Sequence, residues 1–314
     1  MSNMNDAQGL CMPYGKVNSP YETEFEPAIS TVWAYLNPKG LPCYSLELLK
    51  AMIAHDKQLA ENGGRIDFEG EMRKVDYYVT RSRTPGVFNL GGDLGLFVML
   101  IKTGDREALA QYAKLCIDVQ WPRSQSFFSP TLTSISLVQG DALGGGFECA
   151  LASDVIIAEE GAQLGFPEIL FNLFPGMGAC SFLERRIGLR AAEEMILSGK
   201  MLSARKLHEM GVVDVLAPNG QGESTLRSWI AANAKRRNGM QAMLRARQFV
   251  RPVTREELDG IVNLWVDAAL RLGERELKMM SRLARAQARR MEQEHSAQPQ
   301  EGLALLAEPL AMAG

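Results

Sequence analysis

The sequence predicts an α/β core followed by a helical subdomain. Over the first two thirds of the 314 residues, strand-like runs alternate with helical patterns, while the last third carries helical patterns only. Two glycine-rich turns in the first part each follow a strand-like run and precede a helical one. This order is typical of an α/β core with appended helices. No internal repeat is evident.

In the first half of the chain, local signals predict each strand and helix of this α/β core. Residues 28–36 are rich in the β-branched and aromatic side chains of a strand. Ser45 begins a helical pattern that a Gly-Gly pair ends. Residues 74–80 again form a strand pattern and lead to a glycine turn. Asp105 is placed to cap the next helix, whose apolar stripe includes Tyr112.

The second half follows the same rules. Residues 132–140 alternate as a strand does, and a glycine turn then leads into a short helix. Residues 154–166 supply another strand-like run. Ser203 caps a further helix, and Thr254 with Glu257 forms a capping box before a long amphipathic helix. A second long helix follows.

These patterns divide the chain into four segments. We expect a disordered tail over 1–26, an α/β core over 27–215, a C-terminal helical subdomain over 216–292 and a disordered tail over 293–314. The tails are predicted from their Asn, Pro, Gly, Ala and Gln content.

Composition excludes several functional classes. Hydrophobic residues make up 46% and charged residues 23%, as in soluble globular proteins. There is neither an apolar run of about 18 residues nor a secretory signal pattern, so we expect no membrane insertion and a cytoplasmic location. A net charge of −3 argues against nucleic-acid binding. Five scattered cysteines form no CxxC pair, which indicates reduced thiols and no metal site.

The two glycine turns are Asn89–Asp93 and Leu143–Glu148. Each leaves backbone N–H groups unpaired at the start of a helix, and glycine permits close approach of a ligand. Two such groups could converge on one oxygen, as an enolate or a tetrahedral oxyanion requires. Considered alone, either segment is explained equally well as a simple turn between a strand and a helix. Neither matches GxGxxG, and no phosphate loop occurs, so we predict no nucleotide cofactor.

Two glutamates follow the second turn in apolar surroundings. Glu148 lies in Phe-Glu-Cys-Ala-Leu, and Glu168 lies in Phe-Pro-Glu-Ile-Leu. Burial there would raise the pKa of each carboxyl group, and a pair with different pKa values can share acid and base duties. For either glutamate alone, the simpler interpretation is that it complements a helix dipole.

The whole constellation resembles the crotonase (enoyl-CoA hydratase/isomerase) superfamily. The resemblance is carried by residues 138–179 and by the upstream turn at 88–94, with the two glutamates 168 − 148 = 20 residues apart. It implies a ClpP/crotonase-like fold with a repeated ββα spiral core, and an enzyme without cofactors. The site residues it implies are oxyanion-hole amides at Gly92 and Gly145, catalytic carboxylates at Glu148 and Glu168, and substrate contacts at Leu143, Gly144, Met177, Trp265 and Leu283.

The flanking segments resemble the DSF synthase (RpfF-like) branch of that superfamily. This implies dehydration of a 3-hydroxyacyl-acyl-carrier-protein thioester to a cis-2-enoyl thioester, then hydrolysis to a free acid that acts as a diffusible signal factor in quorum sensing. Glu168 would take the proton beside the carbonyl and Glu148 would protonate the departing hydroxyl. The resemblance also implies a homo-oligomer, a trimer or hexamer, and a sensor-kinase receiver domain as partner.

Alternatives stay open at this point. The same residues fit a catabolic enoyl-CoA hydratase acting on CoA thioesters, and a protein whose main role is to bind and regulate the kinase is a third hypothesis. By helical spacing, Trp265 and Leu283 are most simply core residues. Between Arg271 and Arg290 the sequence has seven basic and two acidic residues. They form either a solvated helix face or a docking surface for an acidic carrier protein or its phosphopantetheine.

Overall fold

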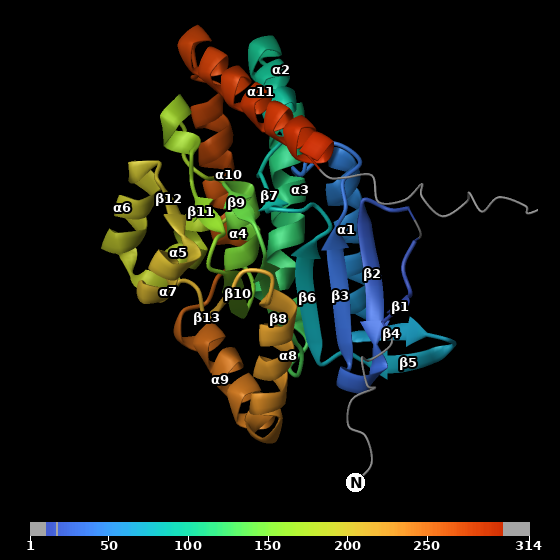
Figure 1. Ribbon diagram of the computed structural model, residues 1–314. Coiled ribbons are helices and arrows are strands. Elements are labelled where there is room, and N and C mark those ends of the chain that lie inside the picture. Colours follow the sequence, from blue (N-terminus) through green and yellow to red (C-terminus); the bar gives the residue numbers. More distant parts are fainter. Residues whose placement is uncertain (1–10, 17, 298–314) are drawn as a thin grey trace, which may run out of the picture.

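The core of the molecule is a seven-stranded sheet with the strand order β1-β2-β3-β6-β8-β10-β13 (Figure 1). The structure is a computed structural model that describes residues 11–16 and 18–297. From β3 to β13 all neighbours run parallel, whereas β1, β2 and β3 pair antiparallel. The strands are β1 (Met12–Pro13), β2 (Tyr21–Glu26), β3 (Thr31–Leu36), β6 (Tyr77–Ser82), β8 (Thr133–Val138), β10 (Val155–Glu159) and β13 (Val215–Ala217).

A smaller sheet lies beside it, in the order β12-β11-β9-β7. Each of three successive chain passes places one strand in the large sheet and the next in the small sheet before turning into a helix. The predicted repeated ββα spiral is thereby confirmed, although the sequence itself shows no repeat. These strands are β7 (Val87–Asn89), β9 (Asp141–Leu143), β11 (Gln163–Gly165) and β12 (Met201–Ser203), and a separate hairpin is formed by β4 (Arg65–Phe68) and β5 (Glu71–Lys74).

Helices cover the sheets and form the last third of the chain. Within the described residues none is long and apolar enough to cross a membrane. The α-helices are α1 (Leu46–Glu61), α2 (Leu94–Thr103), α3 (Arg106–Ser124), α4 (Gly145–Leu151), α5 (Ala179–Ile187), α6 (Leu189–Ser198), α7 (Ala204–Glu209), α8 (Gly222–Asn233), α9 (Arg237–Val250), α10 (Arg255–Ala269) and α11 (Glu274–Ala297), and the 3-10 turns are η1 (Pro27–Ile29), η2 (Ser126–Phe128), η3 (Glu168–Phe171) and η4 (Ala234–Arg236).

The four helix starts predicted from capping residues are confirmed. The side chains of Ser45, Asp105, Ser203 and Thr254 each accept a hydrogen bond from the backbone N–H three residues later. Each bond satisfies one of the N–H groups that a helix leaves unpaired at its start. At Thr254 only half of the predicted box forms, because the side chain of Glu257 instead pairs with Arg185 at 2.8 Å.

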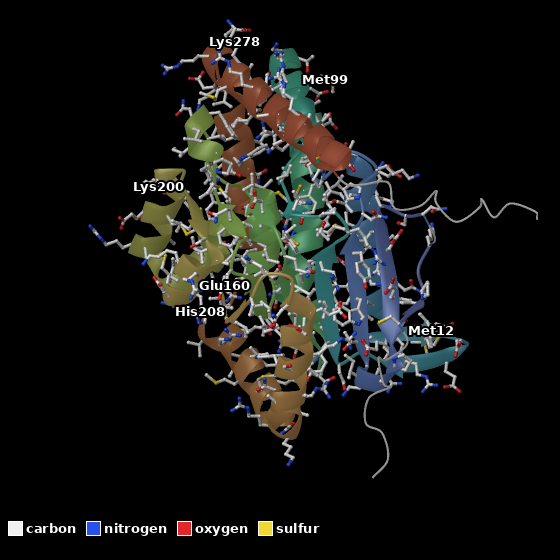
Figure 2. All side chains as sticks on the ribbon, in the orientation of Figure 1. Met12, Met99, Glu160, Lys200, His208 and Lys278 are labelled. Carbon is white, nitrogen blue, oxygen red and sulfur yellow. The ribbon has the colours of Figure 1, made fainter. Side chains whose placement is uncertain are left out.

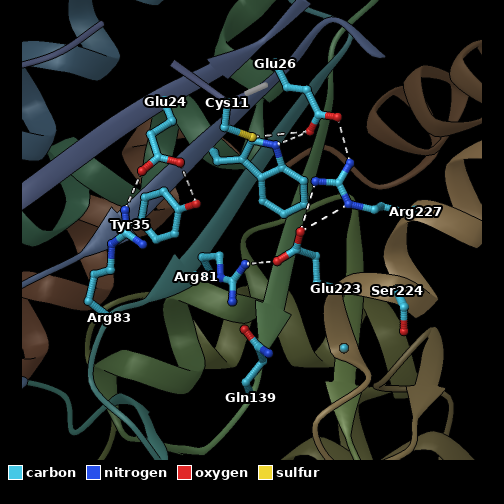
Figure 3. A network of polar contacts seen from close by, with 12 residues as sticks. Cys11, Glu24, Glu26, Tyr35, Arg81, Arg83, Gln139, Glu223, Ser224 and Arg227 are labelled. Carbon is cyan, nitrogen blue, oxygen red and sulfur yellow. Dashed lines mark hydrogen bonds and ion pairs between the residues drawn. The ribbon is translucent and has the colours of Figure 1, made fainter. Parts of the chain in front are cut away.

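The predicted N-terminal tail is wrong in its last part. Residues 21–26 form β2, which pairs with β3 along its whole length. Glu26 is buried and accepts a hydrogen bond from Trp33 Nε1 at 2.9 Å. It also pairs with Arg227 of α8 at 2.7 Å, as Figure 3 shows. Glu26 thus joins this strand to a helix residue 201 positions away.

The other predicted boundaries also differ from the structure. β13, which ends at Ala217, is part of the large sheet, so the core extends past the predicted limit at residue 215. Helix α11 continues to Ala297, beyond the predicted start of the C-terminal tail at residue 293. The rest of the two predicted tails, 1–10 and 298–314, lies outside the described residues.

Candidate active site

The two glycine turns meet because the strands that carry them are neighbours. β7 and β9 pair in parallel, so their C-terminal ends deliver both turns to the same edge of the small sheet. Gly91, at a φ of +92°, is in close contact with the second turn: a Cβ there would stand 2.7 Å from Leu143 O and 3.0 Å from Gly145 N. Only glycine combines this dihedral with such an approach.

Buried side chains hold the first turn in place. Asn89 Oδ1 accepts a hydrogen bond from Gly91 N at 2.8 Å. The hydroxyl of Tyr112 accepts from Asp93 N at 3.2 Å and donates to Tyr44 O at 2.5 Å. Tyr44 N in turn donates to Gly91 O at 2.8 Å. The backbone around Gly92 is therefore fixed before any ligand binds.

The second turn begins helix α4. Gly144, at a φ of +49°, donates its N–H to Gly165 O at 2.9 Å. Gly145 is the first residue of α4, where an N–H has no partner inside the helix. Within the described residues, neither Gly92 N nor Gly145 N has a hydrogen-bond acceptor. Both residues line one cavity, so the arrangement offers two free N–H donors to an oxygen placed there.

Glu148 lies on α4, one turn beyond these donors, and is buried. Its Oε1 accepts hydrogen bonds from Met177 N at 2.7 Å and from Ala179 N at 2.9 Å. Burial raises the pKa of Glu148 to about 7, and these backbone N–H groups oppose that rise. Donors of this kind stabilise the ionised form.

Glu168 is held differently. It is the first residue of η3, preceded by Pro167 at the capping position. A Cβ on Gly144 would overlap its Oε1, and its Oε2 is buried without a hydrogen-bond partner. Burial, together with the charge of Glu148, raises the pKa of Glu168 to about 8. Of the two carboxyl groups, Glu168 holds its proton more firmly.

All nine predicted site residues line the same cavity, which has a volume of about 260 Å³. Trp265 of α10 and Leu283 of α11 form part of its wall, so they are at once core and cavity residues. Met177 lies against the second turn, since a Cβ on Gly145 would overlap its Sδ. The sequence did not assign further apolar wall residues: Leu90, Leu94, Phe97, Ala113, Cys116, Phe171 and Leu173.

Two signals in the sequence could have found part of this wall. The run LGLFVML directly follows the first glycine turn, so a helix beginning there has to pack beside it. The stripe of Tyr112 and Cys116 on α3 was identified, but only as core. Both helices end up beside the two glutamates, and the cavity can hold an apolar chain next to a carbonyl group.

Comparison with known proteins matches the part of the chain that contains this cavity. The family model described as enoyl-CoA hydratase/isomerase matches residues 73–295. The 2,3-dehydroadipyl-CoA hydratase of Escherichia coli (strain K12) is 39% identical over 99 residues, which are 32% of this chain and 38% of that protein. The peroxisomal fatty acid beta-oxidation multifunctional protein AIM1 of Arabidopsis thaliana is 35% identical over 144 residues, 46% of this chain but 19% of that protein. The chain thus spans a small part of these relatives.

Solved structures with this fold include two close in shape. Pseudomonas aeruginosa DspI superposes with a TM-score of 0.61 at 22% identity, covering 81% of this chain and 93% of that one. An enoyl-CoA hydratase from Bacillus halodurans superposes with a TM-score of 0.68 at 18% identity, covering 85% of this chain and 100% of that one. At such identities the likeness establishes the fold, which agrees with the spiral of strands described above.

Proposed function

This chain belongs to the enoyl-CoA hydratase/isomerase family, and on that premise we propose that it interconverts 3-hydroxyacyl and 2-enoyl thioesters by losing or adding water. One observation carries the proposal: two buried glutamates with raised pKa values lie in one apolar cavity beside two unpaired backbone N–H groups. Water addition and loss need one acid, one base and a site for an enolate oxygen.

The proposed steps assign each group a task. The N–H groups of Gly92 and Gly145 donate to the thioester oxygen. In dehydration, Glu168 takes the proton from the carbon next to the carbonyl, and the electron pair forms the new double bond as the C–O bond breaks. Glu148 gives its proton to the departing hydroxyl, which leaves as water. Hydration follows the same path in reverse.

The contacts of the two carboxyl groups determine which of them holds the proton in the resting enzyme. The position of this proton determines whether the enzyme is ready for hydration or for dehydration. With one proton on the pair, the two N–H donors favour the anion at Glu148 and leave the proton on Glu168. That is the state from which hydration starts. Dehydration starts from the other arrangement, in which Glu148 holds the proton and Glu168 is ionised.

The more specific proposal is synthesis of a diffusible signal factor. On this proposal a second step hydrolyses the cis-2-enoyl thioester: water attacks the carbonyl carbon, the oxyanion is held by Gly92 and Gly145, and the C–S bond breaks to release the free acid and a thiol. Support comes from the flanking segments that resemble the DSF synthase branch. Hydrolysis adds no requirement for new residues, because the same donors stabilise a tetrahedral oxyanion.

A catabolic enoyl-CoA hydratase is the second candidate. It is favoured by the similarity of this chain to a CoA hydratase and to a beta-oxidation multifunctional protein. The two candidates differ in product: a hydratase leaves the thioester intact, whereas the synthase releases a free acid. A homo-oligomer and a sensor-kinase receiver domain as partner remain predictions under either candidate.

Mass spectrometry of fatty acids released by cells that express the protein tests the proposal. We expect a cis-2-enoic acid with the wild type and none with Glu148→Gln or Glu168→Gln. Purified wild-type protein should also convert a 3-hydroxydecanoyl thioester to the enoyl form. Conversion without release of acid would favour the catabolic hydratase. Wild-type turnover in either glutamine variant would refute the assigned roles.

A further inference from the structure

Helix α11 carries a row of basic side chains on its outer face. Its members recur at alternating steps of four and three residues, which places them on one side of an α-helix. All six are exposed. We call them the basic stripe: Arg271, just before the helix, and Arg275, Lys278, Arg282, Arg285 and Arg289 within it.

The basic stripe has no partner in the described part of the chain. None of the six takes part in an ion pair there, whereas Arg106, Arg185 and Arg255 elsewhere each pair with a carboxylate. No acidic residue occurs between 277 and 291. Neighbouring like charges at these spacings destabilise a helix. The stripe therefore lowers the stability of α11, in a chain whose net charge is −3.

The opposite face of α11 closes the active-site cavity. Leu283, Ala286 and Gln287 line the cavity that holds Glu148 and Glu168. At 100° per residue Leu283 and Gln287 lie across the helix from the basic stripe, whereas Ala286 lies at its border. Figure 1 shows α11 crossing one end of the molecule over α2. One helix therefore separates the reacting atoms from the cationic surface.

A separate groove lies at the N-terminal half of α11. It runs between η3 and the helix, and Ile169 and Leu170, which directly follow Glu168, form one wall. Arg275, Lys278 and Arg282 lie on the other wall. Exposed apolar side chains accompany these charges: Leu170 and Met279 in the groove, and Met99 of α2 at the same end of the molecule as Lys278 (Figure 2).

We propose that the basic stripe is the docking surface for an acidic carrier protein that delivers the acyl thioester to the cavity. This proposal rests on the proposed function and adds the surface on which the carrier protein docks. Its members within the helix, from Arg275 to Arg289, span 289 − 275 = 14 residue steps, about 21 Å along the helix axis. The phosphates of one CoA molecule would occupy a small part of that length. An acidic helix of a carrier protein matches it in charge and extent, and an arm on that protein could enter beside η3.

Charge reversal tests the docking surface. We expect Arg285→Glu/Arg289→Glu, two stripe residues outside the groove, to lower kcat/KM for a 3-hydroxydecanoyl carrier-protein thioester by about tenfold or more, because attraction between opposite charges sets the encounter rate. The same variant should process the 3-hydroxydecanoyl pantetheine thioester at the wild-type rate. Added salt should slow the carrier reaction of the wild type more than that of the variant.

A matched control keeps the charge change and moves the position. Arg190 on α6 and Lys235 on η4 are exposed, and Arg190→Glu/Lys235→Glu alters the net charge equally. We expect its carrier reaction to stay within about twofold of the wild type, as is usual for charges distant from a contact. An equal loss in the control, or equal losses with both substrates in the stripe variant, would overturn the proposal.

Two further outcomes separate the proposal from the proposed function. A loss confined to the CoA thioester would assign the stripe to CoA phosphates and overturn the carrier. If the wild type dehydrates neither thioester, the proposed function fails. Titration calorimetry with unacylated holo carrier protein then decides docking alone: binding that is weakened in the stripe variant supports it, and equal or absent binding refutes it.

Discussion

At the residue scale, Glu148 and Glu168 differ in what surrounds their carboxyl groups, and this difference predicts a pH profile. The reactive pair holds one proton, so it is most populated between the two pKa values, about 7 and about 8. At lower pH both groups are protonated, and at higher pH both are ionised. We expect kcat/KM for the pantetheine thioester to peak in that interval and to fall on both sides. A flat profile from pH 6 to 9 would contradict the pairing.

Gly144 gives a second prediction at this scale. Its φ of +49° strains any other residue, and a Cβ would overlap Glu168 Oε1. Gly144→Ala should move that carboxyl group, lowering kcat by about 100-fold, since small misplacements of reacting groups have effects of that size. The strained backbone should cost about 1–3 kcal/mol of stability.

The control for this variant is Gly260→Ala in α10. Gly260 is exposed and a Cβ there meets nothing within 4 Å. Alanine in a helix interior should add up to about 1 kcal/mol to the free energy of unfolding and leave kcat unchanged. Urea unfolding and steady-state kinetics measure both quantities. Full activity in Gly144→Ala would show that the position of Glu168 does not depend on this turn.

At the element scale, α10 supplies a wall of the cavity through Trp265. Its ring lies 5.0 Å from that of Phe97, and a Cβ on Gly176 would overlap it. Trp265→Ala should enlarge the cavity and shift selectivity towards longer acyl chains, with a loss of about 3–5 kcal/mol in stability. kcat/KM measured over a series of chain lengths tests this.

Trp229→Ala is the matched control for the tryptophan variant. Trp229 of α8 packs edge-on against Tyr77, with ring centroids 6.4 Å apart, in the separate cluster on the other side of the large sheet. We expect it to lose stability while keeping the chain-length preference of the wild type. A similar change of preference in both variants would mean that loosened packing, and not the lost wall, alters selectivity.

The elements also show which features a sequence reveals. Helices with a side-chain cap, such as those after Ser45 and Ser203, were predicted correctly because the cap is a local signal. Helices α5 and α6 follow Gly178 and Gly188, which offer no such cap, and they were missed. A helical run was expected after the first glycine turn, but the start of α2 was not identified although Asp93 caps it, because the run LGLFVMLIKT is apolar nearly all round and lacks a clear amphipathic period.

The residues of the site also divide into those with a local signal in the sequence and those without one. Both turns and both glutamates were identified from short segments. The walls from α2 and α3 were not, because they reach the cavity only through pairing between strands far apart in the chain, such as β7 with β9. The order of strands in a sheet is a long-range property, and β2 was missed for the same reason: its acidic residues find their partners in β3 and α8.

At the scale of the whole molecule, the site should make stability depend on pH. Both glutamates have folded-state pKa values above their ordinary value of 4.5, so the folded protein binds protons that the unfolded chain has released. Stability is therefore greatest below about pH 4.5 as far as these two groups are concerned, and it decreases as pH rises through about 7 to 8. The buried site thus opposes folding increasingly as pH rises through the range in which it is proposed to work, and most strongly above that range.

Glu168→Gln isolates this contribution. Between pH 5.5 and 8.5 the wild type should lose on the order of 3 kcal/mol more stability than the variant, because each pKa unit corresponds to about 1.36 kcal/mol. Urea unfolding at both pH values measures the two decreases, and comparing decreases cancels any constant cost of the buried amide. Groups common to both proteins, such as Cys11 and Cys180 with pKa values raised to about 11, cancel as well. Parallel decreases would mean that Glu168 is ionised in the folded protein throughout this range, and the proton held there for hydration would have to lie elsewhere.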